Sequence, residues 1–151
     1  SARASHIKLH DATGGIHPQN VLLLTDEQLR QCGISRRKSL YLREIAGAVI
    51  NGGINPARFA AMDPGVVRSS LVKIKGIGHW TVDVYMMFSL RSPDILPLGD
   101  IGIVSAIKDL TGLSSANEIV DCTKKWAPYR TTAAFFLWHY YLEKRGRKFP
   151  H

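Results

Sequence analysis

The 151-residue sequence has few cysteines and no long apolar run, and each shortage argues against a class of protein. Its 2 cysteines, Cys32 and Cys122, lie far apart and lack CxxC spacing, which disfavours a disulfide framework and an iron–sulfur cluster. No apolar stretch approaches the ~20 residues of a membrane-spanning helix, and the N-terminus lacks the apolar core of a secretion signal. We therefore expect an intracellular protein of a reducing compartment, the bacterial cytoplasm or the nucleus, with no membrane partner.

Acidic residues are also scarce. The sequence has 12 of them against 20 lysines and arginines, which gives a formal net charge of +8 and a pI near 9.8. Basic residues gather around 36–38, 73–75 and 144–148. Patches of this kind suit contacts with nucleic-acid phosphates. A generally basic protein without such a partner would have the same composition, so the charge alone decides little.

Apolar residues recur three and four positions apart along nearly the whole chain, which predicts an all-α fold. Thr25 with Gln28 resembles a capping box, and Ser35 is placed to cap the next helix. Pro56 and Pro64 stand where a first-turn proline is tolerated. The predicted helices span roughly 25–32, 35–50, 56–61, 64–73, 80–90, 101–110, 115–125 and 128–144.

The domain organisation follows from the same pattern. Residues 1–24 contain a Gly-Gly pair and scattered polar residues, so we expect a poorly defined N-terminal segment. Residues 25–151 are expected to form one compact helical domain. The last predicted helix, 128–144, carries Phe135, Phe136, Trp138, Tyr140 and Tyr141, and we expect much of that aromatic face to lie in the core.

A glycine turn near 74–79 separates two of the predicted helices. Gly76 and Gly78 remove side chains where the backbone N–H groups of Gly78, His79 and Trp80 would face outward. A helix that begins there directs the positive end of its dipole toward an anion such as a phosphate. Two short helices joined by such a turn form a helix-hairpin-helix, a motif that binds the DNA backbone.

The residues after the turn make the pattern more specific. Trp80-Thr81 begins an apolar helix, and Pro97 stands three positions before the isolated acid Asp100. With these residues the sequence resembles the helix-hairpin-helix DNA glycosylases, most closely the 3-methyladenine DNA glycosylases of alkylation repair. The resemblance covers about 25–145, including the stretch Trp-Ala-Pro-Tyr-Arg at 126–130 and the later Trp138.

This resemblance implies a monofunctional DNA glycosylase of base excision repair. Such an enzyme hydrolyses the N-glycosidic bond of alkylated purines such as 3-methyladenine, after flipping the base out of double-stranded DNA. The family's catalytic aspartate falls on Asp100. Since Asp is also a preferred N-cap residue, a purely structural role at a helix start is the alternative, and the two roles can coexist. Bifunctional members carry a lysine nucleophile at the position of Trp80, so no lyase activity is expected.

The resemblance also assigns the base pocket. Trp80 and Trp138 match aromatic positions that line it, and Tyr129 is a weaker candidate. Aromatic faces would stack on an extruded base and attract its positive charge. For Trp138 there is an equally supported alternative, in which it is an aromatic residue of the protein core carried by an apolar helix.

DNA contacts are expected in and beside the hairpin, at Lys73, Lys75, Gly76, Gly78, His79 and Thr81. The alternative for the lysines and His79 is that they are solvent-exposed residues without a role in DNA binding. Arg130 either contacts a phosphate or pairs with an acid to brace the start of its helix. No cofactor is required, although in the family the hairpin carbonyls can hold a monovalent cation. Here Na⁺ or K⁺ would bind the carbonyls of Val72, Ile74 and Ile77.

Glycosylases of this type usually have further N-terminal helices, which form a second lobe of the base cleft. Residues 1–24 are too few and too polar to replace that lobe. Three explanations are open: a fragment, a shortened paralogue, or half of a site completed by a partner chain. The alternative to the enzyme is therefore a non-catalytic or truncated helix-hairpin-helix module that only binds DNA.

Overall fold

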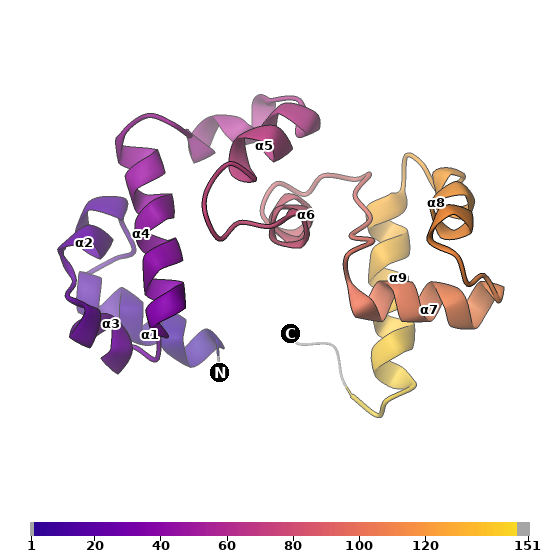
Figure 1. Cartoon of the computed structure of the whole chain (residues 1–151), viewed down its shortest axis with the longest axis horizontal. Coiled ribbons are helices and arrows are strands. Elements are labelled where there is room, and N and C mark those ends of the chain that lie inside the picture. The colour runs from indigo at the N-terminus through magenta and orange to yellow at the C-terminus, as the bar shows by residue number, and fades with distance from the viewer. Residues whose placement is uncertain (1, 148–151) are drawn as a thin grey trace. The chain divides into compact units, whose positions relative to one another are not determined.

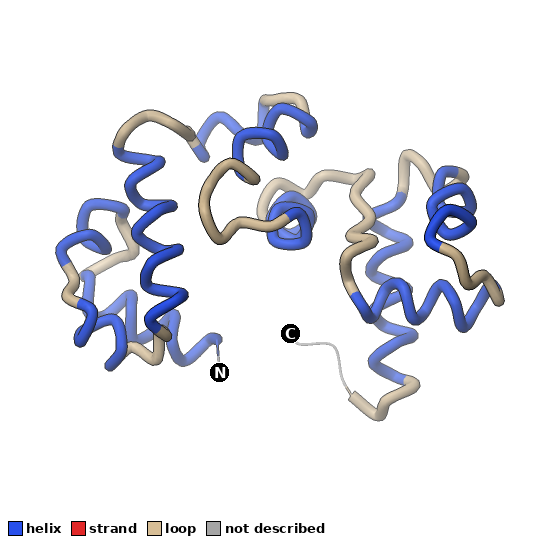
Figure 2. Tube along the Cα trace, in the orientation of Figure 1, coloured by secondary structure: helices blue, strands red, loops and turns tan. Residues whose placement is uncertain are grey.

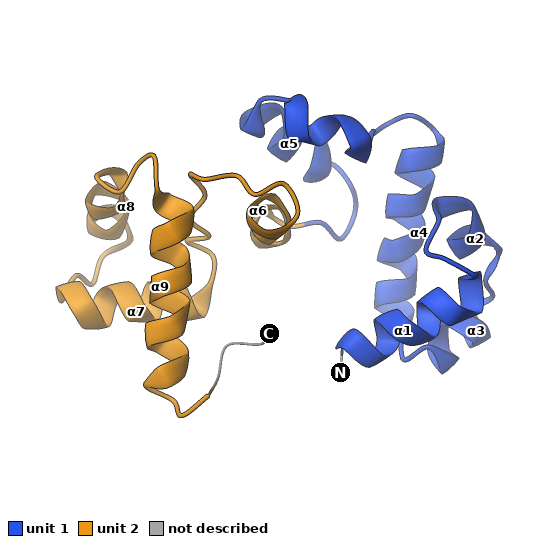
Figure 3. Ribbon diagram, turned by 180° about the vertical axis from the view of Figure 1, so that it is seen from behind, with its two compact units in different colours: residues 1–77 blue, residues 78–151 orange. Residues whose placement is uncertain are grey.

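The computed structural model describes residues 2–147, and its regular elements over that range are helices joined by loops (Figures 1 and 2). The all-α fold predicted from the sequence is confirmed, since no strand occurs among the described residues. The chain divides into two compact units, residues 1–77 and 78–151 (Figure 3). None of the helices in the described part is both long and apolar enough to cross a bilayer.

Unit 1 is built around its longest helix, α4, which packs against α2 and α3. The elements are α1 (Ala2–Thr13), α2 (Pro18–Leu23), α3 (Asp26–Gln31), α4 (Arg36–Ile50), the 3-10 helix η1 (Pro56–Ala61) and α5 (Pro64–Leu71). One apolar cluster in this unit contains the buried residues Leu9, Leu24, Leu29 and Cys32, with Ile34 and Leu42 packed against them.

The N-terminal segment is helical, in contrast to the poorly defined stretch expected for residues 1–24. Leu9 of α1 is 6% exposed and belongs to the apolar cluster of unit 1. Asn20 donates from its side chain to the carbonyl of Thr13 at 2.9 Å, which ties the start of α2 to the end of α1. Helix α1 buries only one residue, so it lacks the repeated apolar stripe by which a helix is recognised in sequence. The division of the chain lies at 77/78, not at 24/25.

The helix starts in unit 1 follow the predicted caps. The Thr25 side chain accepts the Gln28 amide at 3.2 Å and the Gln28 side chain accepts the Thr25 amide at 2.8 Å, which completes the capping box. Ser35 accepts the amide of Lys38 at 3.4 Å at the start of α4. Asp63 caps α5. These signals are local, so the sequence locates them well.

Unit 2 contains α6 (His79–Phe88), α7 (Ile101–Thr111), α8 (Ala116–Lys124) and α9 (Arg130–Glu143). Helix α7 packs against α9. Fully buried side chains come from α6, α7 and α9 and include Val82, Met86, Ile103, Ile107 and Ala134. Helix α9 begins at Arg130, two positions later than the predicted start at Pro128, with Tyr129 as its N-cap.

The aromatic residues of α9 lie beside the core of unit 2, so the expectation holds only in part: Phe135, Trp138, Tyr140 and Tyr141 are partly buried and none is fully buried. The buried residues of this helix are Thr131, Ala134 and Leu137, which recur every three positions and face inward. Phe136 is 72% exposed. The aromatic side chains of α9 therefore flank the buried stripe and remain available to line a site.

Candidate active site

Asp100 is the N-cap of α7, and its carboxylate accepts three hydrogen bonds within unit 2. The amide of Ile103 donates to Oδ1 at 3.1 Å, which is the capping bond. The indole N–H of Trp138 donates to the same oxygen at 3.0 Å, and the indole N–H of Trp80 donates to Oδ2 at 2.8 Å. Both oxygens are thereby fixed in position. The structure thus brings together the three site residues that the sequence pattern singled out.

A cavity of about 600 Å³ surrounds this carboxylate, a size typical of small-molecule sites. Of the described residues that line it, Asp100 is the only carboxylic acid, and none is a lysine, arginine or histidine. In such apolar surroundings a carboxylate interacts with a neighbouring charge more strongly than it would in water. The other lining residues are Trp80, Val84, Phe88, Gly99, Ile101, Gly102, Trp138, Tyr141 and Leu142.

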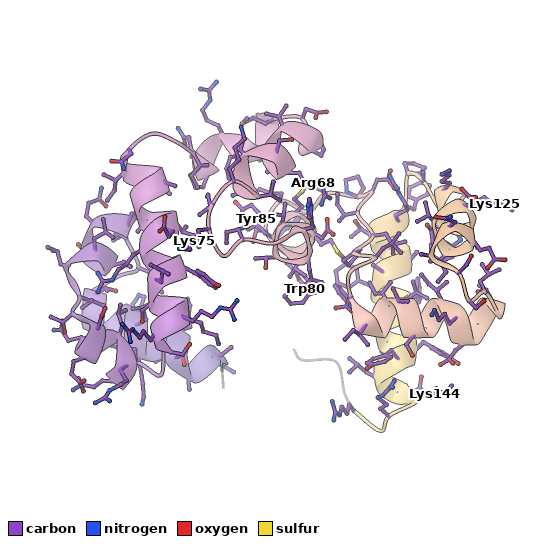
Figure 4. All side chains as sticks on the ribbon, in the orientation of Figure 1. Arg68, Lys75, Trp80, Tyr85, Lys125 and Lys144 are labelled. Carbon is purple, nitrogen blue, oxygen red and sulfur yellow. The ribbon has the colours of Figure 1, made fainter. Side chains whose placement is uncertain are left out.

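The two tryptophans differ in how they are supported. The Trp138 ring lies 6.0 Å from the Phe88 ring at an interplanar angle of 26° and 6.0 Å from the Phe135 ring at 69°. These contacts make Trp138 a packed wall of the cavity. Trp80 is 48% exposed and projects from the first turn of α6 (Figure 4). An aromatic face with this exposure can contact a ligand that enters from solvent.

Tyr129 does not line the cavity, although the sequence suggested it as a pocket residue. It is 69% exposed at the start of α9. Tyr141 lines the cavity instead. Its ring packs against Gly102, where an added Cβ would lie 3.0 Å from a ring carbon. Tyr141 stands three positions after Trp138, so helical spacing alone could have found it.

An ion pair braces the loop that precedes α7. Arg130 donates from Nε and Nη2 to the two Asp94 oxygens at 2.6 and 2.7 Å. This guanidinium lowers the pKa of the Asp94 carboxyl below its usual value, mainly through the side-chain hydrogen bond. The Thr131 hydroxyl accepts the Ile95 amide at 2.9 Å and donates to the Ser92 carbonyl at 2.6 Å. Of the two interpretations of Arg130, the structure therefore shows the brace.

The last residues of unit 1 form the first part of the glycine hairpin. The amide of Ile77 donates to the carbonyl of Ile74 at 3.0 Å and closes a turn. Gly76 has φ of +93°, and a Cβ there would clash with the Tyr41 ring. Both conditions require glycine at this position. Lys73 and Lys75 are exposed, and the latter is labelled on its loop in Figure 4.

The first residues of unit 2 continue the hairpin. Gly78 is the N-cap of α6, and no side chain among the described residues caps the helix there. Its φ is −92° and an added Cβ would meet nothing within 4 Å, so this glycine is not conformationally required. His79 and Thr81 are exposed on the first turn. The N–H groups of this turn lack intrahelical acceptors and are suited to an anion.

The basic C-terminal cluster is partly committed to contacts within unit 2. Lys144 pairs with Asp109 at 2.8 Å (Lys144 is labelled in Figure 4). The Arg145 guanidinium lies 3.9 Å from the centre of the Tyr141 ring. Lys148 lies outside the described residues. The expectation that this cluster serves phosphate binding therefore stays a prediction.

Comparison with known proteins identifies the family. Residues 3–128 match the family described as HhH-GPD superfamily base excision DNA repair protein. Over 135 residues, 87% of this chain, the sequence is 35% identical to the alkylbase DNA glycosidase-like protein mag2 of Schizosaccharomyces pombe. The chain spans 62% of that protein's length.

Two solved structures are similar as well. The DNA-3-methyladenine glycosidase of Bacillus halodurans superimposes with a TM-score of 0.84 and 33% identity, over 96% of this chain and 69% of that one. Mag1 is the 3-methyladenine DNA glycosylase of S. pombe and was solved in complex with abasic DNA. It superimposes with a TM-score of 0.81 and 30% identity, over 91% of this chain and 70% of the Mag1 chain. The resemblance found in the sequence is confirmed, and the chain belongs to the HhH-GPD superfamily of base excision DNA repair proteins.

Proposed function

We propose that this chain is a monofunctional DNA glycosylase that hydrolyses the N-glycosidic bond of alkylated purines such as 3-methyladenine. The observation that carries the proposal is the Asp100 carboxylate, held by the indoles of Trp80 and Trp138 at the wall of an apolar cavity. The similar structures from B. halodurans and S. pombe bear the names of 3-methyladenine enzymes, which supports this substrate class.

Recognition would begin with a base that has been flipped out of the DNA duplex. A base within a duplex cannot reach a cavity, so it must be flipped out, and stacking on an aromatic wall partly offsets the lost base stacking. Alkylation at N3 or N7 gives a purine a positive charge. The electron-rich face of each indole would attract such a base by about 1–2 kcal/mol when water is excluded. Trp80 and Trp138 would therefore favour damaged purines over normal ones.

Bond cleavage would exploit the same charge. The bond between the sugar and the cationic base breaks with its electron pair passing to the base, which leaves as a neutral molecule. The sugar becomes an oxocarbenium-like cation, and the Asp100 carboxylate stabilises it in a cavity of low polarity. Water then adds to the sugar carbon and loses its proton to Asp100 or to solvent. Because three donors already fix the carboxylate, it need not reorient during the reaction.

The product would be an abasic site in an uncut strand. Cleavage of the strand by a lyase step requires an amine that forms a Schiff base with the sugar. Trp80 occupies the position of that lysine in the resembling bifunctional enzymes, and the described lining of the cavity contains no lysine. Hydrolysis is therefore the reaction that these residues support.

We infer that the hairpin holds the DNA backbone. In unit 1 the turn at Gly76 and the exposed Lys73 and Lys75 present backbone and positive charge. In unit 2 the first turn of α6, with His79 and Thr81, has no side-chain cap from the described residues and offers N–H groups to a phosphate. The structure of Mag1 with abasic DNA supports a DNA partner for this chain, which we propose to be double-stranded.

A monovalent cation would fit the carbonyls of Val72, Ile74 and Ile77. Val72 is the C-cap of α5, where the last carbonyls of a helix lack intrahelical donors and the dipole is negative. Backbone carbonyls are suitable ligands for Na⁺ or K⁺. The Ile74 carbonyl also accepts the Ile77 amide and keeps one further lone pair. Such an ion would add positive charge beside the hairpin.

The test is base release by wild type and Asp100→Asn. Purified chain is incubated with methylated duplex DNA, and released 3-methyladenine and 7-methylguanine are measured. Asparagine is also a good N-cap, so the variant keeps the start of α7 while losing the negative charge. We expect release by wild type and little by the variant, with equal DNA binding. Equal DNA binding without release above the variant would instead establish the non-catalytic DNA-binding module.

A further inference from the structure

An arginine of α4 is tied to the glycine hairpin through one tyrosine. Within unit 1, the Tyr41 ring packs directly against Gly76, at the position that a side chain would otherwise occupy. The Arg37 Nε donates to the Tyr41 oxygen at 2.7 Å. The Arg37 guanidinium carbon lies 5.7 Å from the centre of the same ring. Helix α4 therefore carries a positive charge whose position is set relative to the hairpin turn.

The remaining donors of Arg37 are available for a ligand. Arg37 is exposed, and in the described part of the chain no carboxylate pairs with it. Arg43 on the same helix is different, because it donates to the carbonyl of Leu24 at 2.7 Å and pairs with Asp26 at 3.0 Å. Arg43 thus serves the fold of unit 1. In the Arg37 side chain only Nε donates to another described residue of unit 1. Its two Nη groups remain available to donate to two phosphate oxygens at once.

The distance from Arg37 to the turn suits a neighbouring phosphate of one strand. The guanidinium lies 5.7 Å from the ring centre, and the ring is in contact with the turn, at about 4 Å. The charge is therefore within roughly 10 Å of the hairpin, while successive phosphates of one strand are spaced about 3.4 Å along the DNA axis. A phosphate one or two nucleotides from the hairpin would be within reach.

We propose that Arg37 is a phosphate-binding residue for the DNA strand held by the hairpin, and that Tyr41 positions it. This inference rests on the proposed DNA binding of the chain. Tyr41 has two roles here: its ring supports the turn at Gly76, and its oxygen orients Arg37. The hydroxyl proton of Tyr41 remains free to donate to the same phosphate.

The experiment measures the salt dependence of DNA binding. Fluorescence anisotropy is recorded with a duplex that carries an abasic-site analogue, over a series of salt concentrations, for wild type, Arg37→Ala, Tyr41→Phe and Arg36→Ala. Loss of one phosphate contact makes the slope of log K against log salt shallower by about 0.9. We expect that change for Arg37→Ala. Arg36→Ala removes the same charge from the same helical turn, and we expect a smaller change in slope.

Tyr41→Phe separates positioning from charge. It keeps the ring on Gly76 and the net charge of the protein but removes the oxygen that orients Arg37. We expect weaker binding and a shallower slope than wild type, with thermal unfolding unchanged. Equal slopes for Arg37→Ala and Arg36→Ala would overturn the proposal. Wild-type binding by Tyr41→Phe would overturn the role of Tyr41.

Base release measured on the same proteins separates this inference from the proposed function. Release by wild type, together with an unchanged slope for Arg37→Ala, would overturn the role of Arg37 and leave the enzyme in place. A shallower slope for Arg37→Ala without any base release would support the role of Arg37 and overturn the enzyme. A wild-type protein that fails to bind the duplex would overturn both.

Discussion

Trp80 and Asp100 stand 20 positions apart and are joined by a hydrogen bond of 2.8 Å from the indole N–H to a carboxylate oxygen. Trp138 makes the matching bond to the other oxygen at 3.0 Å. Each tryptophan therefore does two things at once: its ring lines the cavity and its N–H fixes the carboxylate. Substitutions that keep an aromatic ring but remove the N–H can separate these contributions.

Trp80→Phe and Trp138→Phe should each lower the rate of base release. A hydrogen bond to a charged group contributes about 1.5–3 kcal/mol, so we expect a decrease of about tenfold or more if the reaction needs the fixed carboxylate. Single-turnover release of 3-methyladenine measures this rate. Trp126→Phe is the control, since Trp126 does not line the cavity. Wild-type rates in both cavity variants would show that the indole N–H groups do not matter.

Gly76→Ala should weaken DNA binding and destabilise the protein. A non-glycine residue in the left-handed region costs about 1–2 kcal/mol, and here the new methyl group also meets the Tyr41 ring. Gly78→Ala is the matched control, because its φ is ordinary and its surroundings are open. Urea unfolding and DNA affinity are measured for both variants. Similar losses for the two would mean that the turn does not depend on the Gly76 conformation.

Arg130→Ala should destabilise unit 2. It removes the bidentate pair with Asp94, whose side chains are 37% and 30% exposed, so screening by water limits the loss to about 1 kcal/mol. The pair of Lys124 with Asp121 is about 70% exposed on both sides, and Lys124→Ala should change stability very little. The midpoint of urea unfolding compares them. Equal midpoints would rule out the brace as a stabilising contact.

The Asp94–Arg130 pair also predicts a pH dependence in acid. The pKa of the Asp94 carboxyl is lowered from its ordinary 3.8, so the folded state favours the charged form. This stabilisation is complete well above pH 3.8 and is lost as the pH falls through the lowered pKa. Asp94→Asn should be less stable than wild type at neutral pH. The two midpoints should converge as the solution is acidified, and a constant difference would contradict the assignment.

Local signals let the sequence predict much of this fold. The Thr25 capping box, the Ser35 cap and the turn around Gly76 depend on residues close in sequence, and the structure has all of them. Pro128 suggested too early a start for α9, since the first helical hydrogen bond runs from the Ala133 amide to the carbonyl of Tyr129, the N-cap. Helix α1 was not predicted, because Leu9 is its one buried residue and its sequence therefore lacks a repeated apolar pattern.

The site was less accessible to sequence reasoning. The motif pointed to Asp100 and the two tryptophans, but the hydrogen bonds that join them link residues 20 and 38 positions apart, and no periodicity reveals such contacts. Tyr141 could have been found by helical spacing from Trp138. The contact between Tyr41 and Gly76 depends on tertiary packing across unit 1, so only the structure shows it.

The capping bond of Asp100 constrains how this sequence can change. Its Oδ1 accepts the Ile103 amide, so the start of α7 needs an acceptor side chain whether or not any chemistry takes place. A lineage that abandons base excision would still be selected for a capping residue at this position. We therefore expect inactive descendants to drift toward asparagine, serine or threonine here rather than toward alanine. A survey of this position could then distinguish loss of catalysis from loss of the fold.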